Sequence, residues 1–394
     1  MSLTRNKNIL LVALVAVVNA LGYGIVLPIL YSYSLRYGLS DFGNGLLFAV
    51  FSICQFISTP IIGRMSDTYG RKPLLVISMA GTFLSFLMMA YAPNILILFI
   101  ARALDGLTAG NLPVAQAVIS DTTKPSERAR GFGIIGASFG FGFVFGPVIS
   151  ALTAGYSPAT PFLIAAGIAL IGTILTMVAL PETNTHMGEV KREKLFDLPK
   201  LWYTLFDPNV GLTFVISLLY FFSFALFLYA FQPYSVKVLN LSIGQISTIF
   251  TTIGIVGLMT QIFLMPRLTK LLGVARALPL AFLSVTLSFV LSYFSTTFPL
   301  YLAAMVLLSL SNGFIQPLIN TILSQETDEQ SQGMIMGLNV SYGSIGQIVG
   351  PILGGAIATV SVGYPFLAAA GVTMICLLLS LRVVRRDSHK ERTF

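Results

Sequence analysis

The chain has 394 residues, of which 55% are hydrophobic and only 10% are charged, and its mean hydropathy is +0.85. Soluble domains carry about 25% charged residues, so this composition excludes an ordinary soluble protein and indicates an integral membrane protein. We attribute the formal net charge of +8 to membrane topology and anionic lipid, and we expect no nucleic-acid partner.

The apolar runs of the sequence indicate helices. A membrane can be crossed by helices or by closed barrels. Barrel strands alternate apolar and polar residues over about 10 positions, whereas a helix needs about 20 apolar residues. The runs in this chain have the helical length and do not alternate. The expected fold class is therefore an all-α membrane protein.

Twelve runs are long enough to cross a bilayer as helices. In chain order they are 8–30, 43–63, 74–92, 95–118, 131–153, 160–180, 209–234, 245–265, 275–296, 299–324, 333–358 and 362–384. The first follows MSLTRNKN and has no small-residue cleavage site, so we expect a retained helix and not a removed signal peptide.

The basic residues predict the orientation. With the N-terminus in the cytoplasm, twenty of the 23 Lys and Arg residues fall in inside segments and only Arg36 and Lys237 in outside loops. The remaining one, Arg102, lies within a run. This asymmetry follows the positive-inside rule and requires an even number of spans. We expect both termini to be cytoplasmic in a multi-pass protein of the cytoplasmic (inner) membrane.

The chain contains an internal repeat. Its least hydrophobic stretch, 182–208, is expected to be a cytoplasmic linker between two six-helix bundles, 1–181 and 209–394. The matching segments are SFG at 138–140 with SYG at 341–343, and GP at 146–147 with GP at 350–351. Two pseudo-symmetric halves with a site between them near the midplane are a recurring transporter design.

The loop GRMSDTYGRK, 63–72, joins the second and third runs. Gly63 and Gly70 allow a close approach and a sharp turn. Asp67, before Arg71 and Lys72, can pair with a basic residue or face a helix N-terminus. The alternative is a charged turn that only satisfies the positive-inside rule.

The run 131–153 contains a ladder of small residues. Its members are Gly136, Gly140, Gly142 and Gly146, followed by Pro147. Small residues let membrane helices approach closely, and a proline bends a helix. Tight packing alone would also account for the ladder.

Two opposite charges, Arg102 and Asp105, lie inside the run 95–118. Each would cost about 2.5–3.5 kcal/mol alone at the centre of a membrane helix. At positions i and i+3 the side chains can meet. They form either a structural ion pair that joins this helix to the first run, or a charge site in a wet cavity. Asp105 is the single carboxylate of this kind, and we expect it to carry any proton that crosses the membrane.

Other polar and aromatic residues within runs are candidates for binding a small substrate. The candidates that we select from the sequence are Asn19, Tyr23, Tyr220, Phe224, Phe227, Asn312, Gln316, Asn339 and Tyr342. Asn312, Gln316 and Asn320 form a stripe at i, i+4 and i+8, for which hydrogen bonds between helices are an equal alternative. Ordinary packing is the alternative for the aromatic residues.

These motifs resemble the major facilitator superfamily, in particular its twelve-helix drug:proton antiporter branch and the tetracycline and multidrug efflux proteins. The loop 63–72 is similar to the signature loop of the family, which implies a conformational latch made by Asp67 and Arg71 with Asp121 and Arg128 on the same face. The run 131–153 is similar to the antiporter signature. Arg102 matches the fourth-helix motif, whereas Asp105 replaces its usual amide.

The resemblance implies proton-coupled export of small amphipathic compounds by alternating access, and so a role in antibiotic resistance. Asn19 stands where the family usually has an acid, and no acid lies near Ser85, so we expect neutral, zwitterionic or weakly charged substrates. A carrier of sugars, amino acids, siderophores or lipids is the alternative, and a membrane sensor or enzyme is more remote. We expect a monomer that is not an enzyme and has no cofactor or metal site.

Overall fold

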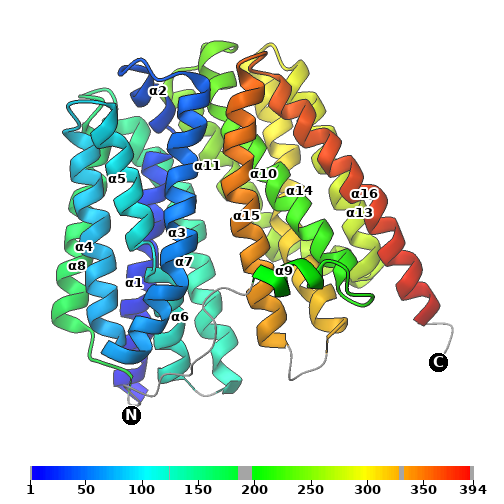
Figure 1. Cartoon of the computed structure of the whole chain (residues 1–394), viewed down its shortest axis with the longest axis horizontal. Helices are drawn as coiled ribbons and strands as arrows, with labels where there is room; N and C mark the ends of the chain where they lie inside the picture. The colour runs from blue at the N-terminus through cyan, green and yellow to red at the C-terminus, as the bar shows by residue number, and fades with distance from the viewer. Residues whose placement is uncertain (1, 124, 185–197, 328–331, 391–394) are drawn as a thin grey trace. The chain divides into compact units, whose positions relative to one another are not determined.

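The computed structural model describes residues 2–123, 125–184, 198–327 and 332–390, and every regular element in these ranges is helical (Figure 1). The chain divides into two compact units. Unit 1 comprises Met1–Leu39, Val50–Leu195 and Ser242–Thr251, and unit 2 comprises Ser40–Ala49, Phe196–Leu241 and Thr252–Phe394. Two helices, α3 and α11, contribute residues to both units.

The helices of the first half follow the predicted runs closely. They are α1 (Ser2–Val26), α2 (Leu30–Leu35), α3 (Asp41–Tyr69), α4 (Arg71–Ala90), α5 (Ile95–Thr108), α6 (Asn111–Thr122), α7 (Pro125–Thr153) and α8 (Thr160–Ala179). The main difference lies in the run 95–118, which forms two helices, α5 and α6, where the sequence predicts one.

The second half also follows the predicted runs. Its helices are α9 (Leu198–Thr204), α10 (Gly211–Lys237), α11 (Ile243–Met259), the π-helical turn η1 (Thr260–Leu264), α12 (Met265–Leu272), α13 (Val274–Phe294), α14 (Phe298–Gln325), α15 (Gln332–Ala358) and α16 (Tyr364–Lys390). Helix α9 lies within the segment predicted as a linker. The predicted run 245–265 continues through η1 into α12.

Membrane-spanning length is met by ten helical segments in the described part of the chain, with Ile95–Thr122 (α5 and α6) and Ile243–Leu272 (α11, η1 and α12) counted as one segment each. Two further apolar helices, Leu10–Val26 and Gly140–Thr153, are shorter within the described residues and fall in the first and fifth predicted runs. The total of twelve spans stays a prediction.

The break between α5 and α6 has a local cause. Pro113 has no backbone N–H to donate to the carbonyl of Ala109, and its ring crowds the preceding turn. Ala109 and Gly110 accordingly leave helical geometry, with φ, ψ of −74°, 28° and −83°, 4°. A Cβ added at Gly110 would lie 2.3 Å from Ile62 Cγ2 of α3, so only glycine fits there.

The repeated glycine motifs pack in the same way within each unit. In unit 1, α7 lies against α1, and a Cβ added at Gly142 would be 2.3 Å from the carbonyl carbon of Ala20. In unit 2, α15 lies against α10, and a Cβ added at Gly350 would be 2.4 Å from Ala225 Cβ. Close backbone approach therefore explains the glycines in both copies.

Candidate functional site

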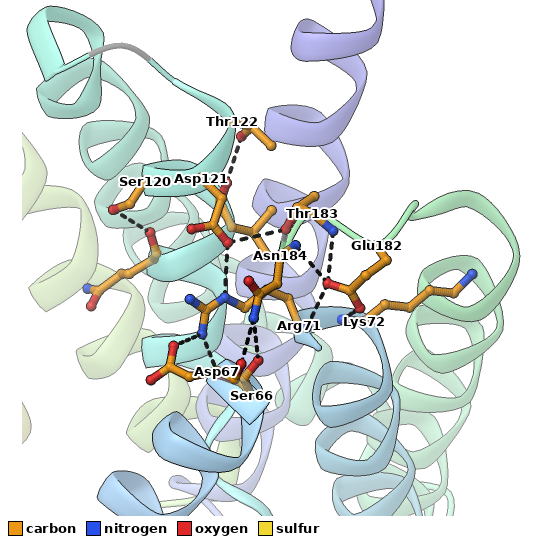
Figure 2. Close-up of polar contacts among 12 residues, drawn as sticks. Ser66, Asp67, Arg71, Lys72, Ser120, Asp121, Thr122, Glu182, Thr183 and Asn184 are labelled. Carbon is orange, nitrogen blue, oxygen red and sulfur yellow. Dashed lines mark hydrogen bonds and ion pairs between the residues drawn. The ribbon is translucent and has the colours of Figure 1, made fainter. Parts of the chain in front are cut away.

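One group of polar residues lies where α3 ends and α4 begins (Figure 2). Arg71, the first residue of α4, donates through Nη1 to Asp67 Oδ1 at 2.6 Å and to Ser66 Oγ at 2.7 Å. Its Nε donates to Asp121 Oδ2, on α6, at 3.0 Å. We call these four residues the Arg71 cluster. The structure thus brings together three predicted latch residues, Asp67, Arg71 and Asp121.

The two glycines of the predicted loop 63–72 differ in their surroundings, and the first of them, Gly63, lies within α3. Gly70 has a φ of +103°, which favours glycine, and a Cβ there would be 2.4 Å from Glu182 Oε2. Gly63 has no described atom within 4 Å of an added Cβ, so its packing does not require glycine. The side chains of Arg128 and of position Gly136 lie outside the described residues.

Glu182 was not predicted from the sequence. Its carboxylate accepts the backbone N–H groups of Arg71 at 2.8 Å and Lys72 at 3.1 Å, which are the first two of α4 (Figure 2). The next residues extend the contact, because Asn184 Nδ2 donates to the carbonyls of Asp67 at 2.8 Å and Ser66 at 3.3 Å. The segment after α8 therefore caps the start of α4 and the end of α3, as a carboxylate at a helix N-terminus does.

This cap depends on pH. Burial raises the pKa of the Glu182 carboxyl, but the backbone N–H groups of Asn184, Arg71, Lys72 and Thr183 outweigh it, and the net pKa is lowered. A lowered pKa in the folded state stabilises docking at pH above the unfolded value of about 4.3, and that contribution is lost as pH falls through the folded pKa.

We therefore expect a spin label at Thr183→Cys, with Cys54 and Cys376 replaced by Ser, to be immobile at neutral pH and mobile once pH falls through the lowered pKa of the Glu182 carboxyl. Glu182→Gln should make the label mobile at every pH, because an amide neither carries the charge nor titrates. Asp207→Asn, which alters the turn that precedes α10, is the matched control and should leave the label unchanged. An immobile label in Glu182→Gln at neutral pH would contradict the expectation.

The second group lies inside unit 1, around the predicted charge pair. Arg102 Nη1 lies 3.1 Å from Asp105 Oδ2, and the two residues are 3% and 8% exposed. The guanidinium carbon of Arg102 lies 4.3 Å from the centre of the Phe51 ring, on α3, in a cation–π contact. The Thr82 hydroxyl of α4 lies beside the Asp105 carboxyl. Arg102 Nε is buried without a partner among the described residues.

The contacts of this pair are with α3 and α4. The nearest predicted residue of α1 is Tyr23, whose ring lies 6.4 Å from Phe51 and 5.9 Å from Phe143. The Tyr23 phenol also interacts electrostatically with Arg102 and Asp105, and Asn19 lies half-buried one turn away on α1. The two opposite charges lie in an apolar interior. Removing either side chain would leave the other charge buried and unpaired, which costs much folding free energy.

Glycine residues and one serine hydroxyl allow α5 to pack closely against α3 and α4. A Cβ at Gly106 would be 2.4 Å from the carbonyl oxygen of Phe51, and one at Gly81 would be 2.2 Å from Thr108 Cγ2. Ser58 Oγ donates to the carbonyl of Gly106 at 2.9 Å. The pair is therefore seated by backbone packing as well as by its own charges.

The candidates in unit 2 form an internal hydrogen-bond network. Tyr220 Oη donates to Asn312 Oδ1. Ser217 Oγ donates to Asn339 Oδ1 at 2.5 Å, and Asn339 Nδ2 donates to Asn320 Oδ1 at 2.9 Å. Hydrogen bonds between helices thus occupy much of the polar stripe on α14. Gln316 Oε1 is buried without a partner among the described residues.

The aromatic candidates of unit 2 differ in their burial. Phe227 is buried and stacks on Phe289 with centroids 5.4 Å apart. Tyr342 is buried and donates to the carbonyl of Leu201, on α9, at 2.6 Å. Phe224 is half-buried between Tyr220 and Phe227. Phe224 is therefore the aromatic candidate with the most free surface.

Within the described residues, no group of three His, Cys, Asp or Glu side chains could hold a metal ion. The structure as a whole has many apolar membrane-length helices, an internal repeat and a buried charge pair inside one helical unit. These features define a multi-pass membrane protein of the secondary-transporter class.

The family model described as the Major Facilitator Superfamily matches residues 12–264 and, in a second match, 213–394. The chain belongs to this family. It is 31% identical to multidrug resistance protein 1 of Bacillus subtilis (strain 168) over 96% of this chain and 97% of that protein. It is 28% identical to the class B tetracycline resistance protein of Escherichia coli over 95% and 96%. The crystal structure of nucleoside transporter NupG shares the fold, with a TM-score of 0.77, 14% identity and coverage of 95% and 99%.

Proposed function

We propose that this protein exports small amphipathic drug-like compounds across the cytoplasmic membrane in exchange for protons. The observation that carries the proposal is the buried Arg102–Asp105 pair inside a membrane-spanning unit. Ionisable residues at such depth are expensive and usually serve transport. The names of the relatives, multidrug and tetracycline resistance proteins, support drugs as the substrate class.

In this mechanism Asp105 takes up and releases one proton per cycle while Arg102 stays positively charged. The pair is neutral overall when Asp105 is ionised, so its apolar surroundings tolerate it. Protonation of Asp105 leaves Arg102 without a counter-charge, and this imbalance favours a change of conformation. One proton that crosses 100 mV supplies about 2.3 kcal/mol, which suffices to drive exchange without ATP.

The Arg71 cluster acts as the conformational latch of the same cycle. The positive-inside pattern supports a cytoplasmic position for this cluster and for both termini. Arg71 bridges α3 and α6 through two carboxylates, and it must release at least one of them for these helices to separate at this end. We propose that the protein acts as a monomer and is not an enzyme.

Transport measured in vesicles under an imposed pH gradient tests the function. The purified protein should move quinolones, tetracyclines or amphipathic dyes against the direction of proton flow, and a protonophore should abolish the movement. Sugars, amino acids and siderophores are assayed in parallel. Gradient-dependent movement of one of these, with no response from any drug, would replace the proposal with a metabolite carrier.

A further inference from the structure

Several buried polar atoms of unit 1 have no hydrogen-bond partner among the described residues, and two of them lie on the packed helices α4 and α6. They are Ser78 Oγ on α4 and Asn111 Nδ2 on α6, in residues that are 1% and 2% exposed. A buried polar group without a partner costs about 1–3 kcal/mol, so such groups are usually satisfied by protein or by ordered water. A pair of them on packed helices therefore points to a hydrated site.

The register of the helices places these two residues at the same level. Helix α4 runs antiparallel to α5 and α6, because the Ser85 hydroxyl donates to the carbonyl of Ala101 at 2.8 Å and the Thr82 hydroxyl lies beside the Asp105 carboxyl. Further along, Arg71 bonds to Asp121 at 3.0 Å. The 11 positions from Thr82 to Arg71 on α4 thus run beside the 16 positions from Asp105 to Asp121 on α5 and α6. Ser78 is one turn, about 6 Å, from Thr82. It lies four of the 11 positions from Thr82 toward Arg71, and the proportionate distance from Asp105 toward Asp121, six of 16 positions, reaches Asn111.

The helix break supplies a third polar group at this level. The carbonyl of Ala109 would normally accept the N–H four residues later, but that residue is Pro113. A water molecule here would accept from Asn111 Nδ2, donate to the Ala109 carbonyl and exchange a hydrogen bond with Ser78. Three partners are typical of a buried water.

The fold does not require these polar residues, because its second copy lacks them. Ser288 bonds to the carbonyl of Ala304 at 2.7 Å, as Ser85 does to Ala101, so positions 203 apart correspond in these helices. At that offset the polar side chains of unit 1 have apolar, buried counterparts in unit 2. In order, Ser78, Thr82, Arg102, Asp105 and Asn111 correspond to Ala281, Val285, Met305, Leu308 and Phe314. The same packing is therefore stable when it is dry.

We propose that Ser78, Asn111 and the Ala109 carbonyl hold a buried water that relays protons between Asp105 and the cytoplasmic solution. This inference rests on the proposed proton-coupled function. The O–H bond of the protonated Asp105 breaks, the proton passes through the Thr82 hydroxyl to the water, and the water gives up a proton toward the solution. Arg102 compensates the carboxylate that remains.

An apolar seal separates this water from the Arg71 cluster. Leu75 on α4 and Val114 and Val118 on α6 lie between the two levels, and all three are fully buried. The seal must part before a proton can leave. Because α6 also carries Asp121, release of Asp121 from Arg71 and opening of the seal are the same movement of α6 about the break at Ala109 and Gly110.

The test uses Ser78→Ala and Asn111→Leu in the full-length protein reconstituted in vesicles. Gradient-driven export should fall at least about tenfold, because a positioned proton-transfer group is worth that much or more. Substrate affinity should stay unchanged, and the ratio of rates in H₂O and D₂O should rise as proton release becomes limiting. Ser85→Ala is the matched control, since its hydroxyl is bonded to the Ala101 carbonyl, and it should retain turnover and isotope ratio.

Each outcome decides the point. Variants that bind substrate normally and keep the original turnover and isotope ratio would overturn the relay. Loss of turnover with equal loss of substrate binding would also overturn it, because that result indicates a packing defect. Asp105→Asn separates the two proposals: if it abolishes coupling while Ser78→Ala and Asn111→Leu do not, only the relay fails. If Asp105→Asn retains coupling, the proton carrier itself is wrong.

Discussion

Replacing Asp105 by Asn is expected to abolish export driven by a pH gradient, with a fall of at least about 100-fold, because the group that carries the proton is removed. The same change leaves Arg102 buried without its 3.1 Å partner. Breaking a buried ion pair by removing one partner costs about 3–5 kcal/mol, so a lower yield of folded protein is also expected. The measurements are counterflow in vesicles under an imposed gradient, and thermal stability in detergent.

The double variant Arg102→Gln/Asp105→Asn separates the two effects. It leaves no unpaired charge, so stability should recover relative to Asp105→Asn, while gradient-driven export should stay absent. Asp207→Asn is a control for loss of a carboxylate elsewhere, because this residue lies in the turn before α10 and not in the pair, and it should export normally. Undiminished proton-coupled export by a well-folded Asp105→Asn would remove Asp105 from the mechanism.

The helices could be predicted from hydropathy because the length of an apolar run is set by the thickness of the bilayer. The runs 160–180 and 275–296 accordingly coincide with α8 and α13 to within a few residues. The break between α5 and α6 was missed for an equally physical reason. Pro113 does not interrupt the apolar run, so hydropathy gives no sign of a break there. The break arises because proline has no backbone N–H to donate to a carbonyl of the preceding turn, and hydropathy does not measure this.

The Arg102–Asp105 contact could be predicted because both residues lie on one helix, where i and i+3 side chains meet. The partners from other helices could not. Phe51 and Thr82 are remote in sequence, and Glu182 lies 111 positions from the Arg71 N–H that it accepts. Only the packing of α3, α4 and α8 brings these groups together. Glu182 had one weak signal, an acid followed by small polar residues directly after a span.

A large effect on folding is also expected for Gly142→Ala. The new Cβ would lie 2.3 Å from the carbonyl carbon and Cβ of Ala20, and backbone atoms of α1 cannot move aside as a flexible side chain can. Overpacking costs about 1–3 kcal/mol and more against backbone, so we expect the upper end of this range or beyond. Thermal unfolding in detergent and the monodisperse fraction on size exclusion measure it.

Gly167→Ala is the matched control in the same unit. Gly167 lies within α8, and an added Cβ there would meet no described atom within 4 Å. Because alanine is favoured over glycine in a helix by about 1 kcal/mol, this substitution should leave stability equal or higher. The two changes add the same methyl group to membrane helices, so opposite signs can arise only from the approach of α7 to α1. Equal stability of both variants would mean that glycine at position 142 is not required by the contact between α7 and α1. Any functional role of the glycine ladder would then come from flexibility of the helix and not from close packing.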